Sequence, residues 1–372
     1  MAHRIVVVGA GYAGLSAAQR AARALGDRAD ITVVNPARRF VERVRLHEVA
    51  AGATPTSLDI AEVLARRRVG FVRGAVTAVE PDAHRVRVET ADGARDLTYD
   101  TLVHTVGSTA DTDGVPGVAR HALTVAGAAD TEATRARVAE LADGGRLTVV
   151  GGGSTGVELV AELAEAHPRL AVRLVTGEEL GGWLSPRGRD HVRAVLDRLG
   201  VEVRDQTKVV EVGPDGVVLA DGGTIAGDAV VWAAGFGVPP LARDAGLAVD
   251  RQGRVLVDDT LRSRSHPDVY AAGDAAVLHG AHGGELRMAC ATALPSGRHV
   301  ADVITARLTA RTPEPMRFEY AFQCLSLGRR DGLIQFVHGD DRPRPRVLTG
   351  RVAALFKEGV VRSTLSMARR SG

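Results

Sequence analysis

Residues 148–158 read TVVGGGSTGVE, in which a short apolar, β-branched run leads into closely spaced glycines and then an acid. Gly151, Gly153 and Gly156 have the G-x-G-x-x-G spacing found where a strand turns into a helix around a dinucleotide pyrophosphate. The first glycine permits the turn, the second lets the backbone approach the phosphates, and the third lets helix pack on strand. Free N–H groups at the helix N-terminus supply the donors. The stretch predicts a parallel α/β unit with a dinucleotide site.

A second copy of this pattern lies near the N-terminus. Residues 5–14 read IVVVGAGYAG, and Gly9, Gly11 and Gly14 repeat the spacing 142 residues before their counterparts. The motif ordinarily ends about 20 residues later with an acid that binds the ribose hydroxyls, and here Asn35 occupies that place. An asparagine amide can accept from one hydroxyl and donate to another. We therefore expect the first site to be intact, with less negative charge.

The corresponding place in the second copy is held by Thr176, with Glu178 two positions later. An acid at the strand tip favours NADH, because it binds the 2′-hydroxyl and repels a 2′-phosphate. A threonine does neither strongly. Arg187 and Arg189 lie close enough in sequence to reach a phosphate, although solvated charges at a helix start are an equal explanation. The sequence thus leaves the choice between NADH and NADPH open.

The composition is that of an ordinary soluble chain. The 372 residues include 45% hydrophobic and 25% charged side chains, with a formal net charge of +2, and the length suggests two or three domains. Aromatic residues make up 3% and there is no long basic run, so we expect no nucleic-acid partner. No apolar run reaches the ~20 residues of a membrane helix. With no room for a signal peptide before the first strand, we expect a cytoplasmic protein.

The chain has two cysteines, Cys290 and Cys324, and they belong to no paired motif. Their separation predicts neither a redox dithiol nor a cysteine-built metal site, and we expect no metal. Cys290 is expected to be a small buried residue.

Strand and helix patterns alternate along the chain and then restart. A strand, a helix and a second strand occupy residues 4–34, and a Gly/Pro-punctuated stretch follows at residues 108–118. The same order begins again at residue 147, and a buried strand at 229–234 closes that unit before a GFGVPP crossing. One α/β domain interrupted by a duplicate of itself explains this order.

Three further motifs join the two glycine fingerprints: TVGS at 105–108, WAAGF at 232–236 and VYAAGDAA at 269–276. Together they resemble the two-dinucleotide-binding-domain flavoproteins of the pyridine nucleotide-disulfide oxidoreductase superfamily. Within it, GGGSTGVELVAELAE is similar to the second fingerprint of type II NADH dehydrogenases and apoptosis-inducing-factor-like quinone reductases.

The resemblance implies an α/β fold with two Rossmann-like domains, the second inserted in the first, plus a C-terminal α+β segment. The implied FAD-binding domain is discontinuous, residues 1–112 and 238–310. Residues 113–237 would bind NAD(P)H, and residues 311–372 would form an interface segment.

The resemblance also assigns roles to residues. FAD would occupy the first site and NADH or NADPH the second, with hydride passing to the flavin. Asp274 would hold the ribityl chain or a phosphate, and Val76 would meet the adenine. Arg45 and His47 would lie near the flavin. Glu158 is the candidate catalytic residue beside the nicotinamide, with a first-turn acid favoured by the helix dipole as its alternative. The expected FAD contacts are Gly9, Gly11, Tyr12, Ala13, Gly14, Asn35, Arg45, His47, Val76, Thr105, Gly107 and Asp274; the expected NAD(P)H contacts are Gly151, Gly153, Ser154, Thr155, Gly156 and Thr176.

The electron acceptor is the part of the predicted reaction that the sequence determines least. Residues 1–237 contain no cysteine, which excludes the cysteine pair that disulfide reductases of this superfamily place beside the flavin. A quinone or a similar small aromatic acceptor is therefore expected. At CATALPSG, however, Ala291 and Pro295 replace the glutamines that line the quinone site of type II NADH dehydrogenases. A tailoring oxidoreductase, a slow redox sensor and a ferredoxin-type reductase stay open as alternatives, and a proline in the first turn would suit a helix start there.

The C-terminal tail has Val352, Leu355 and Phe356 among basic residues, compatible with an interfacial helix. We expect it to dock on the protein's own surface rather than on a membrane. The sequence does not fix the oligomeric state, and a homodimer is one expectation.

Overall fold

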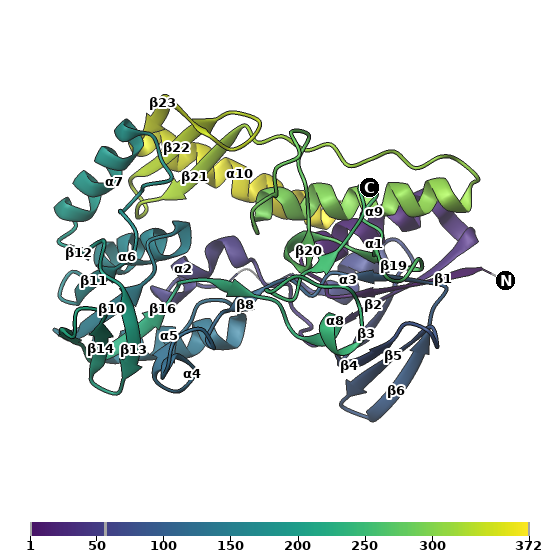
Figure 1. The fold of residues 1–372 in the computed structure, drawn as a ribbon, viewed down its shortest axis with the longest axis horizontal. Coiled ribbons are helices and arrows are strands. Elements are labelled where there is room, and N and C mark those ends of the chain that lie inside the picture. Colours follow the sequence, from purple (N-terminus) through teal and green to yellow (C-terminus); the bar gives the residue numbers. More distant parts are fainter. Residues whose placement is uncertain (1, 56–57, 371–372) are drawn as a thin grey trace.

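The computed structural model describes residues 2–55 and 58–370. Two five-stranded parallel sheets stand side by side, and the C-terminal segment lies across both of them (Figure 1). Within the described residues, no helix is long and apolar enough to cross a membrane.

The first sheet has the strand order β19-β7-β1-β2-β3. Its central strands are apolar on both faces, as buried parallel strands must be. Helices α1 (Tyr12–Leu25) and α9 (Cys290–Leu308) pack together along one face. The strands are β1 (His3–Val8), β2 (Ala29–Asn35), β3 (Gly70–Arg73), β7 (Thr101–His104) and β19 (Val269–Ala271). An antiparallel sheet of β4 (Ala75–Glu80), β5 (Arg85–Thr90) and β6 (Gly93–Thr98) lies beyond its other face.

The second sheet repeats this plan with the order β12-β11-β10-β16-β9. Its strands are β9 (Ala122–Leu123), β10 (Arg146–Val150), β11 (Ala171–Val175), β12 (Glu202–Arg204) and β16 (Ala229–Trp232). Its helices are α5 (Ala128–Leu141), α6 (Ser154–Ala166) and α7 (Pro186–Arg198). A small antiparallel sheet follows, made of β13 (Val209–Gly213), β14 (Gly216–Leu219) and β15 (Thr224–Ala226).

The chain crosses between the two units twice, and the crossings are paired. Strand β8 (Thr109–Ala110) leaves the first unit and pairs antiparallel with β17 (Phe236–Gly237), which returns to it. Strand β19 then completes the first sheet beside β7. The second unit is thus inserted in the first, as the sequence predicts. The domain boundaries at residues 112 and 237 stay predictions, next to this pair of crossings.

The C-terminal segment combines a sheet with a helix. Strands β21 (Phe322–Ser326), β22 (Gly332–Val337) and β23 (Pro343–Thr349) form an antiparallel sheet, and α10 (Gly350–Arg370) follows. The sheet is fixed to the second unit by Gln335, whose buried Oε1 accepts the backbone N–H of Ser185 at 3.0 Å. One face of α10 is buried, whereas Val352, Leu355 and Phe356 are exposed. The tail therefore docks on the protein and also presents an apolar strip.

Short elements complete the fold. They are α2 (Leu46–Ala50), α3 (Ile60–Ala65), α4 (Val118–His121), α8 (Leu241–Asp244), β18 (Val255–Leu256) and β20 (Ala276–Val277), with 3-10 turns at Gly26–Arg28, Arg43–Arg45 and Gly273–Ala275.

The close approach of α9 to α1 yields a stability prediction. A Cβ on Gly297 would lie 2.2 Å from the carbonyl oxygen of Ala13, so Gly297→Ala must push the helices apart. We expect a loss of about 1–3 kcal/mol in the free energy of unfolding, measured by urea denaturation of the full chain. The control is Gly359→Ala in α10, where nothing lies within 4 Å; there, higher helix propensity should add about 0.5–1 kcal/mol. Equal effects at both sites would contradict the packing argument.

Candidate active site

The first glycine turn is shaped by backbone contacts that exclude larger residues. Gly9 has φ +100°, and a Cβ there would lie 2.3 Å from the carbonyl oxygen of Thr105. A Cβ on Gly14 would lie 1.9 Å from the Gly9 carbonyl oxygen. Thr105 also braces the turn, because its Oγ1 donates to the carbonyls of Val8 and Gly9 at 2.9 and 3.0 Å. The turn is built by local sterics, as its spacing predicts.

The N-terminus of α1 is free to bind an anion. Gly11 is the N-cap residue, no side chain caps the helix, and its first turn has no acid. A Cβ on Gly11 would meet nothing within 4 Å, so the backbone there is open to a phosphate group. These features fit the pyrophosphate of a dinucleotide.

Asn35 has a role that its position in the motif does not reveal. Its Oδ1 accepts the N–H of Ala10 at 3.0 Å, and its Nδ2 donates to the carbonyl of Ala37 at 2.8 Å. The amide therefore holds the glycine turn to the tip of β2. Contact of Asn35 with a ribose stays a prediction. Val76 lies in β4, just past Gly74, whose N–H donates to the Asn35 carbonyl at 3.1 Å.

Asp274 lies at the same carboxyl edge of the sheet, in the 3-10 turn after β19. Its Oδ2 accepts the Ser108 hydroxyl at 2.6 Å, and the Arg43 guanidinium donates to the Ser108 carbonyl at 2.5 Å. Burial lowers the pKa of Arg43, and the charge of Asp274 opposes that shift. Gly107 has φ +74°. Ser108 ends the TVGS motif but was not predicted as a site residue, and Arg43 belongs to none of the quoted motifs.

The second glycine turn reproduces the first. Gly151 has φ +123°, a Cβ on Gly156 would lie 1.9 Å from the Gly151 carbonyl oxygen, and a Cβ on Gly153 would meet nothing within 4 Å. Helix α6 begins at Ser154 and Thr155 with no side-chain cap and no acid in its first turn. This second uncapped N-terminus also fits a dinucleotide.

The strand tip beside that turn is closely packed. Thr176 is buried, its Oγ1 would lie 2.6 Å from a Cβ on Gly152, and it accepts the N–H of Glu178 at 3.4 Å. Arg189 pairs with Glu179 at 2.5 Å, which draws its guanidinium toward that carboxylate. The choice between NADH and NADPH stays open.

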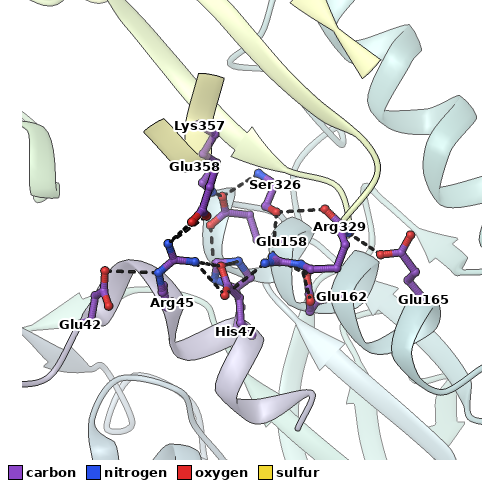
Figure 2. Close-up of polar contacts among 12 residues, drawn as sticks. Glu42, Arg45, His47, Glu158, Glu162, Glu165, Ser326, Arg329, Lys357 and Glu358 are labelled. Atoms are coloured by element: carbon purple, nitrogen blue, oxygen red, sulfur yellow. Dashed lines mark hydrogen bonds and ion pairs between the residues drawn. The ribbon is translucent and has the colours of Figure 1, made fainter. Parts of the chain in front are cut away.

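Glu158 lies at the centre of a partly buried polar cluster (Figure 2). Its Oε1 accepts the backbone N–H of Ser326 at 2.9 Å and a hydrogen bond from the Lys357 ammonium. Its Oε2 lies 3.9 Å from Nδ1 of His47. Because α6 has no acid in its first turn, the alternative of a helix-dipole acid does not describe Glu158. The carboxylate instead joins α6 to the C-terminal segment.

Lys357 is the unexpected member of the cluster. The ammonium is removed from water on the inner face of α10, and burial lowers the pKa of Lys357 to about 7. Glu48 and Glu358 act against this shift, whereas Arg45 adds to it. Burial also lowers the pKa of His47, helped by Lys357, Arg329 and Arg45. The only signal in the sequence is that Lys357 is one of two lysines in an arginine-rich chain.

Two arginines lie beside the Glu158–Lys357 pair and form ion pairs with the neighbouring acids. Arg45 binds Glu48 at 3.0 Å and Glu358 at 2.8 Å, so the segment after β2 is tied to α10. Arg329, in the turn after β21, binds Glu162 at 2.8 Å and Glu48 at 3.1 Å. The direct flavin contacts expected of Arg45 and His47 stay predictions; the structure places both side chains in this cluster.

Comparison with known proteins gives the family. The model of the family described as pyridine nucleotide-disulphide oxidoreductase matches residues 3–298. An NADH dehydrogenase-like protein of Mycobacterium tuberculosis is 32% identical, with 87% of this chain and 86% of that protein covered. The chain belongs to this family. It is accordingly a flavin-dependent oxidoreductase that uses FAD and a pyridine nucleotide.

Further relatives and solved structures are similar over most of this chain. A type II NADH:quinone oxidoreductase of Staphylococcus haemolyticus is 29% identical over 95% of this chain and 93% of its own. Among solved structures, the sulfide:quinone oxidoreductase of Aquifex aeolicus (TM-score 0.83, 19% identity) covers 100% of this chain and 92% of its own. NDH2 of Plasmodium falciparum, in complex with NADH, has a TM-score of 0.83 at 14% identity, with 100% and 97% covered. At such identities the structures show the shared fold.

In this oxidoreductase, α9 differs from two expectations. Cys290 is the first residue of the helix and is exposed, not buried. Pro295 lies inside the helix instead of in its first turn, where its missing N–H removes one helical bond. Ser296 ties the helix to the Asp274 turn, since its Oγ accepts the N–H of Gly273 at 3.0 Å. Within the described residues, no group of side chains is arranged to hold a metal ion.

The two open glycines allow the two ligands to be separated. Gly11 and Gly153 have φ −74° and −72° with extended ψ, so aspartate fits both positions and is a good N-cap residue. A carboxylate there would repel the pyrophosphate. Gly11→Asp should lose most bound FAD, measured by absorbance.

Gly153→Asp is the matched variant, which should keep FAD and weaken NADH binding by about tenfold or more, equivalent to ~1.4 kcal/mol. NADH affinity is measured by titration of the flavin spectrum. Loss of FAD in both variants would contradict separate sites.

Proposed function

We propose that the enzyme passes electrons from NAD(P)H through FAD to a quinone or a similar small aromatic acceptor. The observation that carries this proposal is the Glu158–Lys357 pair, which the C-terminal segment closes over the junction of the two dinucleotide units. Reduction of a quinone to a hydroquinone consumes two protons, so the acceptor needs donors close by. A lysine whose pKa is about 7 is suited to give up a proton near neutral pH.

Different parts of the fold would bind FAD and NAD(P)H. FAD, when bound, would supply the chemistry of accepting hydride and releasing electrons. The N-terminus of α1 would bind its pyrophosphate, and Asp274 would hold the ribityl chain. The N-terminus of α6 would bind the pyrophosphate of NAD(P)H. Glu158 would then lie beside the nicotinamide, because it is one helical turn beyond those donors on α6.

Lys357 and Glu158 would handle protons. Lys357 holds a proton at Nζ that Glu158 accepts as a hydrogen bond, and the low pKa of the ammonium makes transfer to a reduced acceptor favourable. Arg45 and Arg329 position the surrounding carboxylates. The names of the Staphylococcus relatives, type II NADH:quinone oxidoreductases, support a quinone as acceptor.

A second candidate is a tailoring oxidoreductase that acts on a biosynthetic intermediate. It rests on the residues at the start of α9, where Cys290 is exposed and Ala291 and Pro295 stand in place of amide side chains. An acceptor that needs no amide hydrogen bonds would fit such a helix.

Anaerobic stopped-flow mixing tests the proposal. We expect NADH or NADPH to bleach the flavin absorbance, and a short-chain ubiquinone or menaquinone to restore it within the turnover time. A purified protein without bound flavin would contradict the proposal. Reoxidation by other acceptors but by no quinone would favour the second candidate.

Substitution of Lys357 gives a second prediction. The other lysine of the chain, Lys208, is exposed and provides a control. Lys357→Met should slow quinone reduction by about 10²-fold, the usual contribution of a positioned acid. In the native enzyme this step should fall as pH rises through about 7, because the protonated lysine is lost there, and the variant should lack that fall. Flavin reduction by NADH should stay nearly unchanged, and Lys208→Met should behave as wild type. A pH-dependent step that persists in Lys357→Met would contradict the assignment.

A further inference from the structure

Arg43 is a cation at the first dinucleotide site, and neither the motifs nor the proposed function explains its presence there. It lies in the 3-10 turn Arg43–Arg45, and its Nη1 donates to the carbonyl of Ser108 at 2.5 Å. A Cβ on Gly107 would lie 3.6 Å from the same nitrogen. The guanidinium therefore rests against the chain that follows β7, at the carboxyl edge of the first sheet.

The protein does not match the charge of Arg43 with a carboxylate. Within residues 2–55 and 58–370 the guanidinium forms no ion pair. Burial lowers the pKa of Arg43 and Asp274 opposes that shift, but the Oδ2 of Asp274 is turned to the Ser108 hydroxyl. Arg45, two positions later, forms ion pairs with three glutamates. A cation that is partly removed from water calls for a counter-charge, and Arg43 lacks one.

Most hydrogen-bond donors of Arg43 are also unused. Its Nε and Nη2 make no hydrogen bond to the part of the chain that the structure describes. These two nitrogens are not among the buried polar atoms that lack a partner, so they are accessible to a ligand. A guanidinium has five donors in one plane, and the Ser108 carbonyl accepts from only one of its nitrogens. The side chain thus presents a cationic edge that the protein leaves for a ligand.

The strand order indicates which half of FAD this edge faces. Strand β1 leads into the glycine turn that fits the pyrophosphate, with β2 on one side of it and β7 and β19 on the other. In this type of fold the adenosine ribose is bound beyond the tip of β2, so the flavin half extends toward β7 and β19. Arg43 contacts the residues after β7, and Asp274 follows β19. Arg43 therefore lies on the flavin side of the site.

The same side of the site faces the second unit. Ser108 directly precedes β8, which leaves the first unit, and Arg45 belongs to the cluster around Glu158 of α6 (Figure 2). The nicotinamide has to meet the flavin ring at this junction. A hydride brings two electrons and one proton to a neutral ring, so the reduced ring carries one negative charge. Because the N-terminus of α1 already offers donors to the pyrophosphate, the reduced ring is the anion that still needs a cation.

We propose that the guanidinium of Arg43 lies beside the isoalloxazine ring of bound FAD and stabilises the negative charge that the ring gains on reduction. A fixed cation in a partly desolvated site interacts with such a charge more strongly than it would in water. Arg43 thereby favours reduced over oxidised flavin and raises the midpoint potential. The oxidised ring is neutral and gains little from the cation. This role concerns the flavin itself, so it goes beyond the proposed function and holds for any electron acceptor.

Potentiometry of the FAD-loaded enzyme tests the effect of this charge. In Arg43→Gln the ratio of reduced to oxidised flavin at a given potential should fall about tenfold, which is about 30 mV for a two-electron couple. Arg43→Lys keeps the charge and should stay close to wild type. Arg66→Gln removes an exposed arginine at the end of α3 and should leave the midpoint potential unchanged. An unchanged potential in Arg43→Gln, or an equal fall in Arg43→Lys, would overturn the proposal.

Retention of FAD by the same variants separates the ring from the phosphates. After gel filtration, Arg43→Gln should keep as much FAD per chain as wild type, because the cation acts mainly on the reduced ring. Loss of FAD from Arg43→Gln but not from Arg43→Lys would assign the cation to the pyrophosphate. Loss from both variants would make Arg43 a brace for the chain after β7, and either result contradicts a role at the ring. A lowered potential in an enzyme that reduces no quinone would support this role of Arg43 and count against the proposed function.

Discussion

The carboxylate of Glu158 joins two parts of the chain that lie far apart in sequence. It lies on α6 of the inserted unit, and both of its hydrogen-bond donors, Ser326 and Lys357, belong to the C-terminal segment. A charge removed from water is tolerated only when partners replace the lost hydration. The C-terminal segment supplies those partners, so its position over the site meets the needs of a largely desolvated acid.

The surrounding charges explain why a lysine is used there. Glu48, Glu162 and Glu358 are engaged by Arg45 and Arg329, and a guanidinium keeps its proton at any physiological pH. Lysine loses its proton readily when buried, and its pKa is lowered accordingly. The cluster thus combines permanent cations, which fix geometry, with one cation that can exchange a proton. The raised pKa of Glu162, caused mainly by burial, reflects the same shortage of water.

Local rules explain what could be predicted from the sequence. The conformation of the glycine turns follows from sterics between neighbouring residues, so the spacing of the glycines was enough to predict it. The order of strands and helices along the chain was enough to predict that one domain is inserted in the other. Contacts between distant segments obey no such rule. Lys357 reaches Glu158 across 199 residues. Asn35 shows a further limit, because its place in the motif does not reveal that its amide holds the turn to the tip of β2.

The two glycine turns differ in how firmly they are held. Thr105 and Ala233 occupy equivalent places: each donates its N–H to the residue before the turn, Thr105 to Val8 at 2.9 Å and Ala233 to Val150 at 2.8 Å. The Thr105 hydroxyl adds two hydrogen bonds to that turn, and Asn35 adds another; Ala233 has no side-chain group to offer. Fewer hydrogen bonds leave a loop freer to open locally. A firmly braced turn suits a cofactor that stays bound, and a less braced turn suits a coenzyme that must leave in every cycle.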